Sequence, residues 1–548
     1  MSEGKFDVVV VGSGAAGCVV ASYVAEHTNA SVALLEAGSS DNDSMIRMPV
    51  GYAKLLEHDR HLWTYETIPQ HGVPRPYRSG RVLGGGTSVN AMCYVRGQAA
   101  DYDEWQEAVG DTGNWSFKDM LPHFKAQENH DSFSNEFHGV GGELNVMLTT
   151  NINELNQRCM KAFQEYGLPY NVDYNGVSQI GVAPIQATIH NARRWSAVDA
   201  YLRKHILSGR VKLLTEATVT RVLIEGKKAV GVEYLHGNQK KTIRGEEIIL
   251  SAGSLHTPKI LMHSGVGAAA QLKAFGIEVT VDSAEVGENL QDHPIFCAKA
   301  FVKGDMGYQK IASGIGAMKA GLRYFLAKEG PAAGNCIESV SHWNPEDFTA
   351  LPTVQCFHLP VISVQGLMPT GTRSGVTMEM ALLRPHSRGW VRLADDNPTS
   401  MPLINPNFIG DERDLKTAIS AVRAIRKVLA QPSLASIVDE ELEPGLPAQS
   451  DEAIGEWIKK VVNTEWHPVG TCRMGKDRGA VVDARLRVNG VESLRIIDAS
   501  IMPNIVAGNT NAPTQALARN GVTMFVEDFR RGRVVEFRDA RSEEVGLA

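Results

Sequence analysis

The chain has 548 residues, 43% of them hydrophobic, which is enough to fill more than one hydrophobic core. Its formal net charge of -7 and its pI of about 6.2 argue against a general affinity for nucleic acid or anionic lipid, because both bind concentrated Lys and Arg. We therefore expect two domains and a small-molecule partner.

Seven cysteines are scattered along the chain without a CxxC pair, so neither a disulfide framework nor a zinc-type metal site is predicted. This usage favours a reducing, cytoplasmic compartment. Residues 8–25 are uncharged and long enough to cross a bilayer, but three glycines interrupt them. We interpret them as a strand, a turn and a buried helix rather than an integral membrane segment. Glu3 and Asp7 argue against a signal peptide.

The N-terminal segment has the pattern of a dinucleotide-binding turn. The apolar run 6–11 predicts a buried parallel strand that leads straight into a glycine-rich loop. Gly12 permits the tight turn, Gly14 lets the backbone approach a pyrophosphate, and Gly17 lets the next helix pack against the strand. The predicted cofactor contacts here are Gly12, Ser13, Gly14, Ala15, Ala16 and Gly17.

A second predicted strand, residues 31–35, ends at Glu36 and Ala37. A carboxylate about 20 residues after the glycines hydrogen-bonds ribose hydroxyls and repels a 2'-phosphate. Strand, glycines, helix, strand and acid follow in the order of a dinucleotide-binding unit. This unit alone leaves NAD and FAD open.

Residues 81–97 contain three successive glycines followed by Thr87, Ser88 and Asn90. Such a loop can lay its bare backbone against a flat ring or a phosphate, although an ordinary surface turn has the same composition. Residues 211–216, 219–224, 229–234 and 247–251 predict a strand meander that returns to the main sheet.

The small-residue turn at 251–258 opens an apolar helix that ends near Ser264. Thr257 is expected to cap this helix, with Pro258 at its first position. From residue 296 to 459 the pattern of turn residues changes, because prolines interrupt strand-like segments. We predict a cofactor domain formed by 1–150, 206–295 and 460–548, and an inserted substrate domain formed by 151–205 and 296–459.

Two C-terminal segments carry candidate catalytic groups, WHPVGT at 466–471 and NTNAPT at 509–514. A neutral imidazole can accept a hydroxyl proton, an amide can hold the oxygen, and a bound redox ring can take the hydride. Pro468 and Pro513 limit the freedom of the two loops. With the N-terminal fingerprint, they predict cofactor-dependent removal of hydrogen from an alcohol.

The chain resembles the glucose-methanol-choline (GMC) family of FAD-dependent oxidoreductases over nearly its whole length. The resemblance rests on five separated motifs in the family's order: GSGAAG with LLEAG, GRVLGGGTSVNAMCYVRG, GSLHTPKILMHSGVG, VGENLQDH at 286–293, and the two C-terminal loops. It selects FAD over NAD. It implies an α/β fold, with a Rossmann-like FAD-binding domain and an inserted α+β substrate-binding domain built on an antiparallel sheet.

By this resemblance His467 matches the family's catalytic histidine and Asn511 its usual partner, whereas His293 is expected to be structural. Val89 stands where some relatives carry a histidine that attaches FAD covalently, so noncovalent FAD is expected. Besides the glycine turn, the expected FAD contacts are Glu36, Ala37, Arg81, Val82, Gly85, Asn90, Met92, Cys93, Val219, Ala252, Asp498, Ala499, Asn511 and Thr514.

The expected reaction is oxidation of a primary alcohol to the aldehyde by hydride transfer to the flavin, with His467 as general base. Either oxygen or a quinone-type carrier is compatible as acceptor, and the carrier would allow peripheral membrane association. Glu338 lies where choline-acting relatives have a carboxylate, although a locally paired buried acid fits equally well. A neutral, possibly aromatic alcohol is favoured over choline, and the expected pocket residues are Trp466, Glu338, Trp343, Phe357 and His358.

Two other classes of function are also compatible with this family. Some members are hydroxynitrile lyases, which keep FAD without redox turnover. A noncatalytic flavin-binding protein is disfavoured, because the loops that carry His467 and Asn511 would then have no task.

Overall fold

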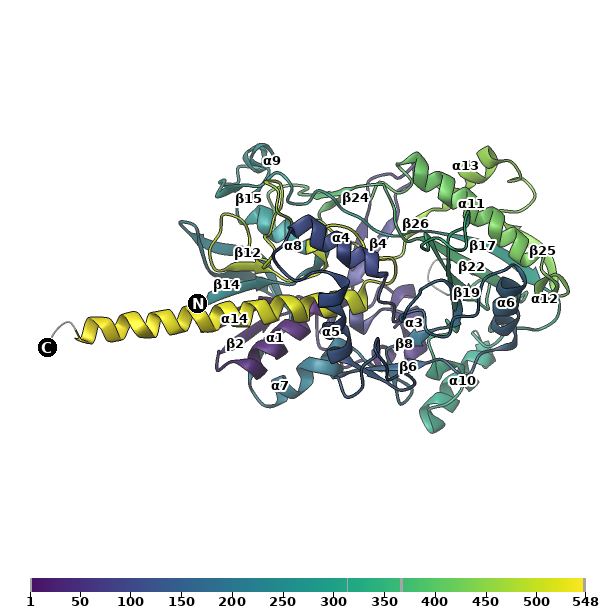
Figure 1. The fold of residues 1–548 in the computed structure, drawn as a ribbon, viewed down its shortest axis with the longest axis horizontal. Coiled ribbons are helices and arrows are strands. Elements are labelled where there is room, and N and C mark those ends of the chain that lie inside the picture. The colour runs from purple at the N-terminus through teal and green to yellow at the C-terminus, as the bar shows by residue number, and fades with distance from the viewer. Residues whose placement is uncertain (1, 313, 365–367, 546–548) are drawn as a thin grey trace.

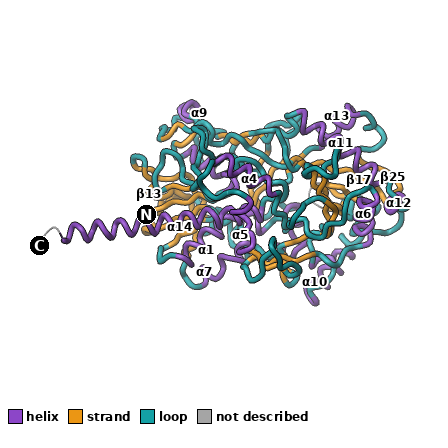
Figure 2. The backbone as a smooth tube through the Cα atoms, in the orientation of Figure 1, coloured by secondary structure: helices purple, strands orange, loops and turns teal. Residues whose placement is uncertain are grey.

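Two seven-stranded sheets, one in each half of the molecule, organise the fold (Figure 2). The structure is a computed structural model that describes residues 2–312, 314–364 and 368–545. The mixed α/β architecture and the antiparallel second sheet agree with the predicted fold class.

The first sheet has the strand order β11-β2-β1-β14-β13-β12, and β27 pairs with the end of β14. Parallel pairing of β1, β2 and β11 buries the valine-rich core of β1, as the apolar run predicted. The strands of this sheet are β1 (Ser2–Val11), β2 (Val32–Leu35), β11 (Val211–Leu214), β12 (Ala217–Glu225), β13 (Lys228–His236), β14 (Gln239–Leu250) and β27 (Leu494–Ile496).

The predicted meander is formed by β12, β13 and β14, which pair antiparallel before β14 returns in parallel beside β1. Helix α8 (Gly253–His263) follows. Its capping prediction is wrong, because α8 begins at Gly253 and Pro258 lies inside it. Thr257 instead donates a hydrogen bond from Oγ1 to Asp498, 2.6 Å away.

Helix α1 (Ala15–His27) packs against β1 and β2 and alongside α14 (Asn511–Val545). The beginning of α14 lies near the centre of the molecule, and the helix then runs out past the edge of the first sheet (Figure 1). Residues 509–511 therefore lie where the two halves meet.

The second sheet is antiparallel, with the order β25-β17-β22-β19-β18-β7 and β26 beside β17. Helices α6 (Glu154–Glu165), α11 (Glu412–Leu429) and α13 (Asp451–Val461) pack on it. Its strands are β7 (Gly181–Pro184), β17 (Pro294–Val302), β18 (Ser339–Trp343), β19 (Val354–Leu359), β22 (Gly375–Leu382), β25 (Val438–Glu443) and β26 (Asn463–Thr464).

Two of these strands cross the predicted segment limits. β17 begins at Pro294, before the expected insertion point at residue 296, and β26 lies within the segment 460–548 assigned to the cofactor domain. The short polar strand β26 pairs antiparallel with the first residues of β17, Pro294 and Ile295. The domain limits themselves stay a prediction.

Shorter elements complete the two halves. They are α2 (Ser44–Arg47), α3 (Tyr52–Glu57), β3 (Leu62–Glu66), β4 (Pro76–Gly80), α4 (Ala99–Val109), α5 (Phe117–Gln127), β5 (Glu128–His130), β6 (Leu144–Leu148), β8 (Gln186–Ala187), α7 (Arg203–Leu207), α9 (Ala269–Ala274), α10 (Gly314–Ala327) and α12 (Pro432–Ala435). Within the described residues, no helix combines the length and hydrophobicity needed to cross a bilayer.

Candidate active site

A cavity of about 380 Å³ lies where the carboxyl ends of the first sheet meet the second sheet. Most of the predicted site residues line it. They are Gly12, Ser13, Gly14, Ala15, Ala16, Glu36, Ala37, Gly85, Asn90, Met92, Cys93, Val219, Ala252, Phe357, Trp466, His467, Asp498, Ala499, Asn511 and Thr514. Segments more than 500 residues apart in the sequence thus share one cavity.

Three expected cofactor contacts do not line the cavity. A Cβ on Gly17 would lie 1.8 Å from the carbonyl oxygen of Gly12, so this glycine permits the close packing of helix and strand. Val82 is fully buried in a small hydrophobic cluster. Arg81 is exposed and places its guanidinium 4.1 Å from the centroid of the Trp63 ring.

Glu338 does not face this cavity either. Its Oε2 accepts hydrogen bonds from the backbone and side-chain nitrogens of Asn153, each at 2.6 Å, and its Oε1 accepts one from Tyr308. The residue belongs to a separate pocket beside α10. These contacts make Glu338 a locally paired acid, the second of the two interpretations that the sequence left open.

Trp343 and His358 are core residues rather than pocket residues. Trp343 is 1% exposed and packs beside Phe163. The ring of His358 is hydrogen-bonded on both nitrogens, to Ser339 and Ser341. Their strands are buried on both faces, so an aromatic residue on them does not have to point into the cavity.

The glycine-rich side of the cavity is a cradle formed by backbone. Gly12 has a φ of +95°, and a Cβ there would lie 2.5 Å from the Ser251 carbonyl oxygen. A Cβ on Gly14 would meet nothing within 4 Å, and one on Gly85 would lie 2.8 Å from the Gly14 Cα. Helix α1 starts here without a side-chain cap, so its first amides are available to an anion.

Glu36 organises the same cradle. Its carboxylate accepts hydrogen bonds from the Ser13 amide (3.0 Å) and the Gly38 amide (2.8 Å). Burial raises the pKa of Glu36, against the effect of these hydrogen bonds. The acid lies at the end of β2, where a ribose hydroxyl is recognised in dinucleotide-binding folds.

Three buried polar atoms that line the cavity have no hydrogen-bond partner among the described residues: Ser254 Oγ, Glu465 Oε2 and Trp466 Nε1. Buried polar groups are normally paired, so this grouping fits a cavity that receives a polar ligand. Trp466 also has a φ of +60°, a strained backbone conformation for a bulky residue. The cradle and the unpaired donors and acceptor together fit a bound dinucleotide with a substrate beside it.

The motif LQDH at 290–293 holds the loop that carries His467. Asp292 accepts a hydrogen bond from the His467 amide at 2.9 Å, and its other oxygen accepts hydrogen bonds from Tyr77 and Thr464. Burial raises the pKa of Asp292 to about 6 despite these donors. The backbones of Gln291 and Val469 pair reciprocally beside it. The motif therefore positions the histidine.

The hydrogen bonds of His293 define the tautomer of His467. The Val506 carbonyl can only accept, so His293 Nε2, 3.0 Å away, donates. Burial lowers the pKa of His293 to about 4, so its ring is neutral and Nδ1 accepts. Nδ1 of His467, at 3.0 Å, must then be the donor. This leaves the lone pair of His467 on Nε2.

The amide beside that lone pair belongs to Asn509 and not to Asn511. Asn509 Nδ2 lies 3.3 Å from His467 Nε2, and Gln355 donates to Asn509 Oδ1 at 3.4 Å, which fixes the orientation of the amide. Asn511 lines the cavity, but it begins α14 and its Oδ1 accepts from Gln515 at 3.0 Å. The structure therefore places Asn509 beside His467, and the catalytic role of Asn511 stays a prediction.

The sequence alone did not identify two acidic residues that line the cavity. Glu465 Oε2 lies 3.6 Å from His467 Nδ1, and burial together with the charges of Glu379 and Asp292 raises its pKa well above the ordinary value. Burial raises the pKa of Glu379 to about 7. Glu379 is the one charged residue in the apolar strand β22, and that contrast was the available signal.

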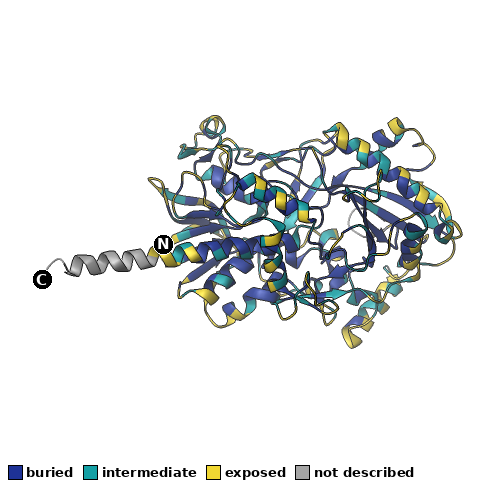
Figure 3. Ribbon diagram, in the orientation of Figure 1, coloured by how far each residue is buried: buried dark blue, intermediate teal, exposed yellow. Residues whose placement is uncertain are grey.

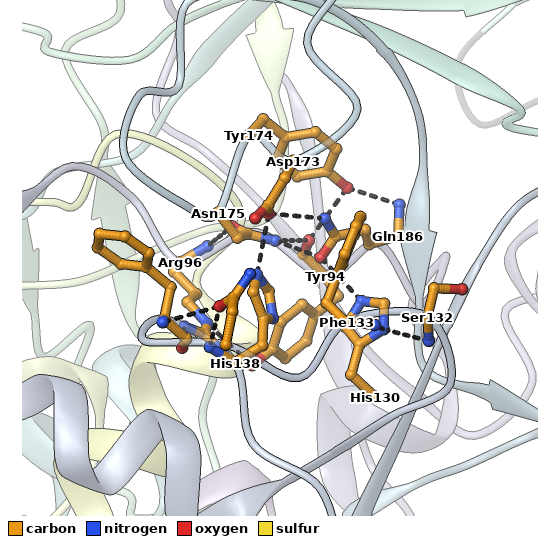
Figure 4. A network of polar contacts seen from close by, with 12 residues as sticks. Tyr94, Arg96, His130, Ser132, Phe133, His138, Asp173, Tyr174, Asn175 and Gln186 are labelled. Atoms are coloured by element: carbon orange, nitrogen blue, oxygen red, sulfur yellow. Dashed lines mark hydrogen bonds and ion pairs between the residues drawn. The ribbon is translucent and has the colours of Figure 1, made fainter.

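A buried network of hydrogen bonds and ion pairs holds the loop 93–97 (Figure 4). The guanidinium of Arg96 pairs with Glu128 at 2.8 Å, and His138 lies between Glu128 (3.0 Å) and Asp173 (2.9 Å). Burial alone would lower the pKa of His138, but its hydrogen bonds to the two acids raise it. His138 and Arg96 thus neutralise the buried Glu128 carboxylate, and His138 also pairs with the partly buried Asp173.

Two groups of three donor side chains are close enough to hold a metal ion among the described residues. One is Glu128, His130 and His138, whose acid is already paired with Arg96. The other is His293, Glu465 and His467, the group described above. In both, the side chains are engaged with one another or with neighbouring residues.

Comparisons with known proteins identify the family. Two GMC oxidoreductase family models match residues 6–295 and 385–518. An alcohol dehydrogenase [acceptor] of Pseudomonas putida is 38% identical over 95% of this chain and 96% of its own length. An oxygen-dependent choline dehydrogenase of Brucella anthropi is 37% identical, with 93% of each chain covered.

A solved structure, pyridoxine 4-oxidase from Mesorbium loti, superposes with a TM-score of 0.86 at 30% identity, covering 95% of this chain and 99% of that one. The predicted family and its FAD cofactor are confirmed. These relatives bear the names of oxidoreductases, which does not favour the lyase alternative. The chain belongs to the GMC oxidoreductase family and is an FAD-dependent enzyme that acts on CH–OH donors.

Proposed function

We propose that the protein oxidises a primary alcohol to the aldehyde, with His467 as the general base. The observation that carries this proposal is the position of His467, which lines the FAD cavity with Nε2 beside the Asn509 amide and Nδ1 beside His293. A base needs a lone pair directed at the substrate hydroxyl.

His467 Nε2 accepts the hydroxyl proton, and Asn509 Nδ2 donates a hydrogen bond to the developing alkoxide. FAD, when bound, supplies the hydride acceptor. Burial, and next the neighbouring His293, holds the pKa of His467 well below its usual range. The base is therefore neutral at pH 7. The Glu465 carboxyl, 3.6 Å from Nδ1, is placed to stabilise the imidazolium that forms.

The proposed substrate is a neutral alcohol with an apolar or aromatic substituent. Ile337, Phe357 and Trp466 provide apolar wall, and burial raises the pKa values of Glu379 and Glu465, which disfavours a negative charge on either acid. Val89, which lines the cavity, has no atom that forms a bond to flavin, and this supports noncovalent FAD. The cysteine usage supports a cytoplasmic location.

Choline oxidation is the second candidate, because Glu379 and Glu465 both line the cavity and the Brucella relative is named for choline. A cationic substrate would be favoured by ionised acids. Since the pKa of Glu379 is about 7, choline should bind more tightly as the pH rises from 6 to 8. A neutral alcohol should show no such dependence.

The test is an anaerobic panel of benzyl alcohol, 1-octanol and choline, read by the bleaching of the flavin absorbance. We expect the neutral alcohols to bleach the flavin fastest. Bleaching by choline alone would replace the first candidate with the second, and no bleaching by any alcohol would overturn both. Mixing the reduced enzyme with oxygen or a soluble quinone then identifies the acceptor.

A further inference from the structure

Helix α10 turns its apolar face away from the protein. Five large apolar side chains recur at spacings of three or four residues and therefore share one face. They are Ile315 (69% exposed), Met318 (68%), Leu322 (59%), Phe325 (55%) and Leu326 (79%). In Figure 3 this helix lies at the lower right and is mostly exposed. A helix on a protein surface normally buries such a face, so the arrangement requires an explanation.

The opposite side of α10 attaches the helix to the protein. Tyr324 is 2% exposed and packs with Met48 and Ala332. The ammonium of Lys328 lies 4.2 Å from the centroid of the Tyr324 ring. The helix is thus held by one face while its larger apolar face remains outside.

Positive charge predominates in the segment that contains this face, although the chain as a whole has a net charge of -7. Residues 303–329 contain five basic side chains and two acidic ones, a local net charge of +3. The acids form exposed ion pairs, Asp305 with Lys310 and Glu329 with Arg323, each at 3.0 Å. The basic residues are Lys303, Lys310, Lys319, Arg323 and Lys328.

We propose that the outer face of α10 docks the protein on an anionic lipid bilayer. An exposed apolar stripe flanked by Lys and Arg is the pattern of a helix that lies in the membrane interface, with its apolar side chains in the acyl boundary and its cations at the headgroups. A second copy of the chain is a poorer fit. Its own cationic flank would meet the flank of the first, and 14 residues are too few for a coiled-coil seam.

The segment that follows α10 leads to one wall of the FAD cavity. The chain leaves α10 and reaches Asn335, whose carbonyl accepts a hydrogen bond from Tyr52 at 3.0 Å. Tyr52 and Ile337 both line the cavity. The docking itself does not rest on the proposed reaction.

The test is flotation of the FAD-loaded full-length protein with vesicles of phosphatidylcholine, with or without about 30% phosphatidylglycerol. We expect binding to the anionic vesicles and its loss near 1 M salt, where the Debye length is about 3 Å. The variant Leu322→Ser/Phe325→Ser should bind at least about tenfold more weakly. Lys319→Glu/Arg323→Glu should also lose binding to the anionic vesicles.

The matched control is Leu207→Ser/Leu446→Ser, which changes two leucines that are 81% and 87% exposed elsewhere. It should bind as the parent does. FAD content and melting temperature verify that each variant is folded. Equal binding by the parent and the α10 variant would overturn the proposal, as would a parent that binds neither vesicle. A dimer that dissociates only in the α10 variant, without vesicle binding, would assign the face to a second copy and also overturn it.

Discussion

The two walls of the cavity differ in whether backbone or side-chain atoms form them. The wall that contains the glycine-rich turns, here called the nucleotide wall, is mainly backbone. Its glycines stand where a Cβ would collide with neighbouring atoms or would fill the cradle. The catalytic wall is made of side chains, His467, Asn509 and Glu465, that are oriented by His293 and Asp292. We infer from this difference that FAD binding and catalysis can be separated by mutation.

A large effect on FAD binding should come from filling the nucleotide wall. Gly14→Val adds a side chain where nothing lies within 4 Å, so the apoprotein should fold while the side chain occupies the cradle. We expect FAD affinity to fall more than about 100-fold, or roughly 2.7 kcal/mol. Flavin titration and apoprotein melting temperature measure this. Gly321→Val, at a similarly open glycine in α10, is the control and should retain FAD.

On the catalytic wall, Asn509→Ala and Asn511→Ala distinguish the two amides. Removing a donor to a developing oxyanion costs about 10²- to 10³-fold in rate. Asn509→Ala should therefore slow flavin reduction by that factor, and Asn511→Ala by much less. Single-turnover reduction with a bound alcohol is the measurement. The opposite ranking would restore Asn511 as the partner.

The variant His293→Leu tests whether His293 positions the ring of His467 or only packs against it. Removing a group that orients a histidine typically costs about 10- to 100-fold. Because His293 contributes to the lowered pKa of His467, the acid limb of the rate profile should also move to higher pH. A purely structural role would lower the rate without moving that limb, which would contradict the assigned tautomer.

The smallest effect concerns the network behind the nucleotide wall. The pKa of His138 is raised in the folded protein, so its charge stabilises the fold below the ordinary pKa of histidine, and this contribution disappears as the pH rises through the raised value. His138→Gln should thus cost about 1.5–3 kcal/mol near pH 5.5 and less at pH 9. Urea unfolding at both pH values measures it, with exposed His236→Gln as control. Equal losses at both pH values would mean that His138 is uncharged.

The nucleotide wall could be predicted from sequence because its requirements are local. Gly12, Gly14 and Glu36 act through one turn and the strand after it. The catalytic wall depends on contacts between distant segments. His467 was identifiable through its loop, but the choice between Asn509 and Asn511 depended on where α14 begins. Trp343 was misplaced because its strand is buried on both faces, and the sequence pattern does not separate those faces.

The most direct test of the account is the rate of flavin reduction in His467→Ala, measured by anaerobic stopped flow with an alcohol that reduces the parent. The account predicts a rate about 10²- to 10⁴-fold lower, because general-base assistance is lost, with FAD still bound at the parental level. An unchanged rate with full FAD content would show that another group removes the hydroxyl proton, and would contradict the central claim.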